Sequence, residues 1–497
     1  MARLIRINDK DNVAVALSPV AKGENVAIGE GASEISVCAA EEIPQGHKMA
    51  LRDIACGENI IKYGFPIGHA LEDIKAGSWL HTHNVKTNLK GEVEYSYTPE
   101  AELLPRKEPA VFNGFIRKDG RAAVRNEIWI LPTVGCVNGV CETLARENQD
   151  LVSGTIDGIY TFKHPFGCSQ TGADHAQTRK LLAALADHPN AAAVLVVSLG
   201  CENLTHEQFV EALGDYDKDR IRFLICQEVE DEYAVGRELL RECASYAKQF
   251  TRESVSADKL VIGMKCGGSD GLSGITANPT VGVFSDMLCG EGGTTILTEV
   301  PEMFGAEGML MNRCISREVF DKAVHMLNGF KQYFISHNEV VYDNPSPGNK
   351  KGGITTLEDK SCGCVQKGGS APIMDVLDYA DKVQTKGLNL LYGPGNDLVS
   401  ATALTAAGAH IILFTTGRGT PFGAPAPTIK IATNTALFEK KPGWMDFNAG
   451  TCAEGESIAS AAGRLMELVL QVAEGKETCA EKHGFREISI FKDGVVL

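Results

Sequence analysis

Five short apolar segments of this chain each lead into a turn that carries a cysteine, and this recurrence constrains the fold more than any other feature. The segments are residues 128–131 before Cys136, 158–162 before Cys168, 193–197 before Cys201, 221–225 before Cys226, and the run from residue 261 before Cys266. Runs of this length and composition are typical of strands that are buried on both faces of a sheet. If these strands lie parallel in one sheet, several sulfur atoms meet at one edge. The pattern therefore predicts an α/β fold with a metal or redox site at that edge.

Cys168, Cys201 and Cys266 are the strongest candidates for metal ligands, because each lies beside glycine and polar residues. A thiolate in such a turn binds a metal or acts as a nucleophile. A single cysteine is more often a buried and inert residue, so only the repetition favours the functional interpretation. Cys226 could equally belong to the core of its strand.

Length, charge and cysteine usage limit the class of protein. A chain of 497 residues exceeds one ordinary core, which predicts two or three domains. The formal charge of −16 argues against nucleic acid or an anionic membrane as a partner, although it does not exclude a small anionic substrate. No apolar run approaches the length of a membrane span, and 15 cysteines without a dense disulfide spacing fit a reducing cytoplasm. The oligomeric state stays open, and a homo-oligomer is compatible with the sequence.

The composition and the hydrophobic pattern change along the chain, and these changes predict an α/β protein with three domains. Residues 1–90 contain short alternating segments between tight turns, which is typical of a small β-rich domain. Residues 91–111 are rich in Glu and Pro and are expected to form a linker. After the linker, strands alternate with helical patterns, which predicts two Rossmann-like α/β domains at residues 112–251 and 252–497.

Several histidines could add metal ligands or a base. His81 and His83 lie two residues apart in an extended segment, so both rings face the same way, which suits a metal site. His47 follows a glycine in a turn of the same small domain. For each of these three residues, a surface or core position is the more common alternative. His175 stands at a predicted helix start near Cys168 and is a candidate general base.

A Gly-rich turn follows Cys266 and offers polar side chains for substrate contacts. Ser269, Asp270 and Asn278 lie among glycines near a predicted helix start, and backbone amides in such a turn can hold an anion. The carboxylates of Glu299 and Glu302, in contrast, are interpreted as solvated charges, as most such groups are.

Two further segments of the last domain carry candidate contacts to an anion. The segment NPSPGNKKGG contains Asn349 and two lysines, of which Lys350 or Lys351 could face an anion, between prolines that fix the backbone and glycines that permit close approach to a ligand. An ordered structural crossover is the alternative interpretation of this segment. The segment TTGRGTP follows a predicted strand and contains Thr416 and Arg418, whose guanidinium can hold a carboxylate through two hydrogen bonds.

Long motifs occur over nearly the whole chain: GHKMALRDI, KYGFPIGHA, GCSQTGADH, SLGCE, CGGSDGLSGITANPTVG, TEVPEMFGAE, NPSPGNKKGGITTLEDKS and FTTGRGTPFG. Together they resemble the altronate/galactarate dehydratase family, and the N-terminal domain resembles the SAF domain of that family. The motif HTHN at residues 81–84 and the motif GCSQTGADH are more similar to the altronate members. The resemblance implies dehydration of D-altronate to 2-dehydro-3-deoxy-D-gluconate, with Fe(II) or Mn(II) as the cofactor.

The chemistry of this reaction indicates which groups the enzyme needs. A proton beside a carboxylate is weakly acidic, so the enzyme must stabilise an enediolate, which a divalent cation assisted by Arg418 would do. His175 or a lysine such as Lys350 would take the C2 proton, and an acid would help the C3 hydroxyl to leave. The iron ligands remain open: Cys168, Cys201 and Cys266 with His47, His81 or His83, a set of His and carboxylate, or an Fe–S cluster.

Three alternative functions remain. Galactarate is the second candidate substrate. A non-catalytic protein that binds sugar acids would need neither iron nor the thiols. A nicotinamide oxidoreductase is disfavoured, because no complete G-x-G-x-x-G fingerprint follows a predicted strand.

Overall fold

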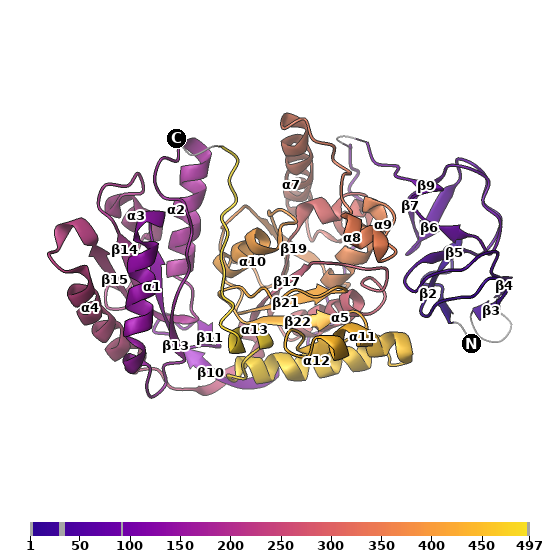
Figure 1. Cartoon of the computed structure of the whole chain (residues 1–497). Coiled ribbons are helices and arrows are strands. Elements are labelled where there is room, and N and C mark those ends of the chain that lie inside the picture. The colour runs from indigo at the N-terminus through magenta and orange to yellow at the C-terminus, as the bar shows by residue number, and fades with distance from the viewer. Residues whose placement is uncertain (1–2, 29–34, 91–92, 495–497) are drawn as a thin grey trace.

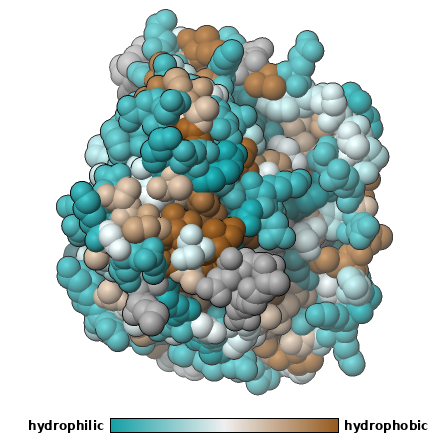
Figure 2. All heavy atoms as spheres, turned by 90° about the vertical axis from the view of Figure 1, so that its right-hand side faces the viewer, coloured by the Kyte–Doolittle hydropathy of each residue, from teal (hydrophilic) through white to brown (hydrophobic). Residues whose placement is uncertain are grey.

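The computed structural model describes residues 3–28, 35–90 and 93–494, and the chain forms a small β-rich part, a middle part and a C-terminal part. The C-terminal part lies between the other two (Figure 1). Seen from the side of the small part, the surface is mainly hydrophilic, with a hydrophobic area near its centre (Figure 2). Among the described residues, no helix combines the length and apolarity that crossing a lipid bilayer requires.

The small N-terminal part consists of short strands that pair antiparallel in the orders β1-β2-β5-β8, β3-β4 and β6-β7-β9. They are β1 (Leu4–Ile5), β2 (Val13–Ala16), β3 (Asn25–Ile28), β4 (Ile35–Cys38), β5 (Lys48–Ala50), β6 (Asn59–Lys62), β7 (Phe65–Ala70), β8 (Trp79–Leu80) and β9 (Val85–Lys86). Burial alternates along β3, as expected for a strand with one solvated face. Ile60, Ile67 and Leu80 share one hydrophobic core with the C-terminal part, so the small part is docked onto it.

The middle part contains a four-stranded parallel sheet in the order β13-β12-β14-β15. Its strands are β12 (Glu127–Pro132), β13 (Gly158–Thr161), β14 (Ala191–Ser198) and β15 (Ile221–Ile225), and its helices are α1 (Asn138–Glu147), α2 (Gly172–Ala186), α3 (His206–Leu213) and α4 (Glu232–Ala247). Every residue of β14 is buried, which explains the uninterrupted apolar sequence of this strand.

The strands of a three-stranded antiparallel sheet, in the order β11-β10-β16, precede and follow the middle part along the chain. It consists of β10 (Val111–Ile116), β11 (Ala122–Ala123) and β16 (Glu253–Ser256). The chain therefore enters and leaves the middle part through the same small sheet.

The C-terminal part is built on a seven-stranded parallel sheet in the order β19-β20-β18-β17-β21-β22-β23. Its strands are β17 (Val261–Cys266), β18 (Thr294–Leu297), β19 (Ile373–Leu377), β20 (Gly387–Leu391), β21 (Ile411–Thr416), β22 (Thr428–Ala432) and β23 (Phe447–Asn448). Its helices are α5 (Ala277–Gly290), α6 (Glu307–Leu310), α7 (Arg317–Ser336), α8 (Pro347–Lys351), α9 (Leu357–Cys364), α10 (Asp397–Ala406), α11 (Thr435–Lys440), α12 (Ile458–Ala473) and α13 (Cys479–Lys482).

The expected linker packs against the C-terminal part, and its described residues 93–110 form no helix or strand. The hydroxyl of Tyr95 donates to the carboxylate of Glu307 at 2.8 Å, and the hydroxyl of Tyr97 donates to the carbonyl of Cys314 at 2.8 Å. These contacts hold the connection between the first two parts against the third.

The prediction that the cysteine-tipped strands share one sheet is wrong. Cys136, Cys168, Cys201 and Cys226 follow the strands of the four-stranded sheet, whereas Cys266 ends β17 in the seven-stranded sheet. An apolar run predicts that a strand is buried, but the sheet that it joins depends on tertiary contacts that the run does not encode.

Candidate active site

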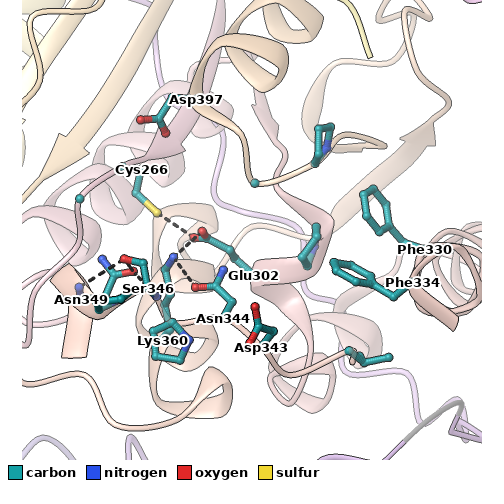
Figure 3. Close-up of a pocket in the computed structure, with 18 of the residues that line it drawn as sticks. Cys266, Glu302, Phe330, Phe334, Asp343, Asn344, Ser346, Asn349, Lys360 and Asp397 are labelled. Atoms are coloured by element: carbon teal, nitrogen blue, oxygen red, sulfur yellow. Dashed lines mark hydrogen bonds and ion pairs between the residues drawn. The ribbon is translucent and has the colours of Figure 1, made fainter. Parts of the chain in front are cut away.

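A cavity of about 820 Å³ opens at the carboxyl edge of the seven-stranded sheet (Figure 3). Along the chain, β17 is the first of the seven strands, and in the sheet it lies between β18 on one side and β21 on the other. Where strand order reverses in this way, a crevice remains outside the carboxyl ends of the strands, and ligands of open α/β sheets bind there. The wall of the cavity includes Cys266 at the end of β17, Glu302 after β18 and Asp397 after β20.

Two thiols and one carboxylate meet at this wall. The Sγ atoms of Cys266 and Cys364 are 3.3 Å apart, and Oε2 of Glu302 lies 3.1 Å from the first sulfur and 3.0 Å from the second. Cys266 ends β17, Glu302 lies in the 3-10 helix Val300–Met303 after β18, and Cys364 ends α9. All three residues are buried, and within the described ranges they are the one group of three potential metal ligands within 4.8 Å of one another. We call them the thiol–carboxylate group.

Buried lysines surround the thiol–carboxylate group and pair with carboxylates. The Nζ–O distances are 2.7 Å for Lys360–Glu302, 3.0 Å for Lys265–Glu299, 2.7 Å for Lys265–Asp397 and 3.7 Å for Lys367–Glu299. Burial alone would raise the pKa of Glu302, but Lys360 and Lys367 outweigh it and hold this pKa at about 2. Glu302 is therefore ionised at neutral pH, and Figure 3 shows it between Cys266 and Lys360.

Residues 343–350 form another wall of the cavity. The buried Asn349 donates through Nδ2 to the carbonyl of Ser269 at 2.8 Å, and its Oδ1 accepts from the hydroxyl of Ser346 at 2.8 Å. Lys350 on α8 is half-buried and lines the cavity, whereas the neighbouring Lys351 is exposed. α8 therefore presents one ammonium group to the cavity and one to solvent.

Aromatic rings close the remaining side of the cavity. Phe330, Tyr333 and Phe334 come from α7, and Phe491 comes from the C-terminal segment. The ring centroids of Tyr333 and Phe491 are 5.5 Å apart. This apolar wall excludes water from one side of a site that is otherwise lined by charge.

Of the five predicted substrate contacts, Asn349 lines this cavity. The other four form hydrogen bonds with neighbouring loops. Asp270 accepts from Thr433 and Asn434, and Asn278 donates to the carbonyl of Gly363 and accepts from Thr415. Thr416 accepts from the amide of Gly419, and the carbonyl of Ser269 accepts from Asn349. Burial raises the pKa of Asp270. Their contact with a substrate stays a prediction.

The three predicted catalytic residues lie in different places. Lys350 lines the cavity, and Arg418 is exposed beside α8, with Nη1 3.5 Å from the carbonyl of Gly348. His175 lies on α2 in the middle part and does not line this cavity.

The predicted metal ligands of the middle part, Cys168 and Cys201, follow β13 and β14 and do not belong to the thiol–carboxylate group. Cys168 is half-buried and Cys201 is exposed. Glu202 fastens this sheet edge, because its Oε1 accepts from the hydroxyl of Thr133 at 2.6 Å and from the amide of Leu199 at 3.0 Å. Metal binding at this edge stays a prediction.

His47, His81 and His83 gather around Trp79 in the small part. Their ring centroids lie 5.0 Å apart for His47–His81 and 5.1 Å for Trp79–His83, and Nε2 of His47 lies 3.4 Å from the carbonyl of Lys351 on α8. Burial and then the charge of Lys48 lower the pKa of His81 to about 4. A neutral imidazole is the form that binds a metal, so the prediction of metal ligands here also stays open.

The interpretation of Glu299 and Glu302 as solvated charges is wrong, because they are only 1% and 4% exposed. Lys360 and Cys364 were also not singled out by the sequence. The apolar residues around Glu302 in the motif TEVPEMFGAE are the one signal that could have indicated a buried carboxylate.

Thiols, carboxylates and lysines gathered in a cavity at the carboxyl edge of a parallel sheet are typical of an α/β enzyme. Three family models match successive parts of the chain: the altronate/galactarate dehydratase SAF domain matches residues 2–88, the second domain of D-galactarate dehydratase/altronate hydrolase matches 114–248, and the C-terminal domain of D-galactarate/altronate dehydratase matches 257–496.

Full-length relatives support the same assignment. The chain is 49% identical to an altronate dehydratase of Escherichia coli over 99% of both chains, and 51% identical to an altronate dehydratase of Bacillus subtilis over 100% of both. It is 33% identical to a galactarate dehydratase of Escherichia coli, over 99% of this chain and 97% of that one. The chain belongs to the altronate/galactarate dehydratase family of hydro-lyases, and its small N-terminal part is the SAF domain.

Proposed function

We propose that this chain dehydrates D-altronate to 2-dehydro-3-deoxy-D-gluconate. The observation that carries this proposal is the identity of about half of all residues with two altronate dehydratases over their full length. The galactarate dehydratase is also a full-length relative, but its identity of 33% gives weaker support to galactarate as the substrate than the two altronate dehydratases give to altronate. We also interpret the two larger domains as Rossmann-like, since each combines a parallel sheet with helices that connect its strands.

The cavity offers the positive charge that this reaction needs. Loss of the C2 proton places a second negative charge on the substrate, and Lys350 and Lys360 bring ammonium groups to the cavity wall. A divalent ion, Fe(II) or Mn(II) in this proposal, supplies further positive charge to the substrate carboxylate when it is bound. The thiol–carboxylate group fits Fe(II), the softer of the two ions, in the type and spacing of its donor atoms.

Asp397 and Lys350 are the acid–base pair of the proposal. Lys265 holds Oδ1 of Asp397 at 2.7 Å, and the Asp397 side chain is 33% exposed where it lines the cavity, so Oδ2 can accept the C2 proton. Lys350 donates a proton to the departing C3 hydroxyl. In this proposal Arg418, whose Nη1 lies 3.5 Å from the carbonyl of Gly348 on α8, contacts the substrate carboxylate.

The test is an assay of reduced, anaerobically purified and iron-loaded protein with altronate, galactarate and mannonate, in which the 2-keto acid product is quantified. We expect the product from altronate, and its loss in Asp397→Asn. Product from galactarate alone would refute the substrate, and no product from any of the three acids would refute the dehydratase function.

A further inference from the structure

The thiol–carboxylate group has the form of a three-ligand metal site with one open side. Two thiolates on a tetrahedral metal at about 2.3 Å lie about 3.8 Å apart, so the 3.3 Å between the sulfur atoms of Cys266 and Cys364 requires only a small outward rotation of the side chains. Cys266 and Glu302 line the cavity, whereas Cys364 does not. A metal held by the three would keep a coordination position toward the cavity, as catalytic metal sites do.

The charges around the group set a condition on binding. Three carboxylates, those of Glu299, Glu302 and Asp397, lie among three ammonium groups, those of Lys265, Lys360 and Lys367. Each of the three carboxylates is paired with at least one of these ammonium groups. A metal-bound thiol is deprotonated, so the two cysteines would contribute the negative charge that balances a bound dication.

From this geometry we infer that Cys266, Cys364 and Glu302 bind one thiophilic divalent metal ion as two thiolates and a carboxylate. The inference deepens the proposed dehydratase function, on which it rests for the role of the ion. Two thiolates favour Fe(II), Co(II) or Zn(II) over Mn(II) and Mg(II), because hard ions prefer oxygen ligands. Of the two metals of the proposed function, the inferred ligands therefore favour Fe(II) over Mn(II).

The first experiment is a titration of the reduced, metal-free full-length protein with Co(II) under anaerobic conditions. We expect one ion per chain and a near-ultraviolet band from thiolate-to-cobalt charge transfer. Cys266→Ser and Cys364→Ser should each weaken binding by about tenfold or more and roughly halve the band. Glu302→Gln should weaken binding and keep the band.

Cys362→Ala is the matched control. Cys362 lies on the same helix as Cys364 and is equally buried, but it is outside the thiol–carboxylate group, so its variant should bind Co(II) as the original chain does. Thermal denaturation of each variant separates loss of the site from loss of the fold.

Three outcomes would overturn the inference: no Co(II) bound, an unchanged band in both serine variants, or loss of the band in Cys168→Ser or Cys201→Ser. The proposed function fails separately. If the protein binds metal as expected but does not turn over altronate, the proposed function is wrong and the inferred metal site stands. If a metal-free Cys266→Ser variant keeps full turnover, the inferred metal site is wrong and the proposed function stands.

Discussion

At the scale of single residues, the cavity is built from charges that are almost fully removed from water. Lys265, Lys360, Glu299 and Glu302 each pair with an opposite charge within 3.0 Å. A buried pair of this kind adds little net stability, because desolvation offsets the attraction. Removal of one partner is nevertheless destabilising, because the other charge stays buried without a partner. Such pairs therefore fix positions more than they strengthen the fold.

The two adjacent lysines of α8 give the first prediction. Lys350→Met should lower kcat/KM for altronate by about 100-fold or more, because a group that transfers a proton is lost. Lys351→Met should leave kcat/KM unchanged, since Lys351 is exposed and does not line the cavity. Steady-state kinetics of both variants check this, and an equal effect of the two substitutions would contradict the assignment of Lys350.

At the scale of elements, helix α9 connects the SAF domain to the cavity. Every residue of α9 is buried. The carboxylate of Asp359 accepts from Lys48 at 2.7 Å and from Lys62 at 3.0 Å, both in the SAF domain, while the next residue, Lys360, pairs with Glu302 at the cavity. Burial would raise the pKa of Asp359, but the two lysines lower it. The SAF domain thus positions one wall of the site through a single helix.

The second prediction concerns this connection. Asp359→Asn leaves two buried lysines without a carboxylate, so the free energy of unfolding should fall by about 3–5 kcal/mol. Urea denaturation measures this change, and cleavage of the linker by a protease should become faster. Asp53→Asn is the control, because the Asp53–Lys75 pair is exposed and screened by solvent, so its loss should change the free energy of unfolding far less. Equal losses in both variants would mean that Asp359 does not hold the interface.

The third prediction follows from the turn after β8. The pKa of His81 is about 4 in the folded protein and about 6.5 in the unfolded chain, so the unfolded chain binds more protons between these values. The stability that neutral His81 contributes is complete above pH 6.5 and is lost as the pH falls toward 4. The melting temperature should therefore drop more steeply over this range for the original chain than for His81→Gln. Parallel curves would show that His81 is not buried against its neighbours.

At the scale of the whole molecule, the C-terminal segment ties the middle domain to the cavity. Phe491 lines the cavity, and the amides of Asp493 and Gly494 donate to the carboxylate of Asp174 at 2.8 and 2.7 Å. Asp174 lies in the first turn of α2 in the middle domain, next to His175. These hydrogen bonds connect α2 to the segment that supplies one aromatic wall of the site.

The fourth prediction tests this tie. Asp174→Ala removes two hydrogen bonds to a charged group, which should lower stability by about 2 kcal/mol and raise KM for altronate, because Phe491 loses its anchor. Hydrogen exchange should speed up at the amides of Asp493 and Gly494. Asp150→Ala, which breaks an exposed pair with Arg237, is the control and should change neither KM nor this exchange. Unchanged exchange in Asp174→Ala would contradict the anchoring role.

The sequence predicted the buried strands and one member of the thiol–carboxylate group, and the reasons are physical. Uninterrupted apolar runs such as that of β14 report burial directly. Cys266 was predicted because it ends such a run, but its partners Glu302 and Cys364 lie 36 and 98 residues further along the chain. Only the folded sheet brings them together. The altronate/galactarate dehydratase resemblance was confirmed, since it rests on long motifs rather than on spatial proximity.

The buried contact of Lys48 and Lys62 with Asp359 has one more consequence. These contacts are non-covalent, so the connecting segment also keeps the SAF domain at a high effective concentration near its docking surface. The SAF domain therefore resembles a separate subunit that is covalently joined to the rest of the chain by the connecting segment. A chain cut within residues 93–110 should remain associated as two pieces, and it should separate only on dilution.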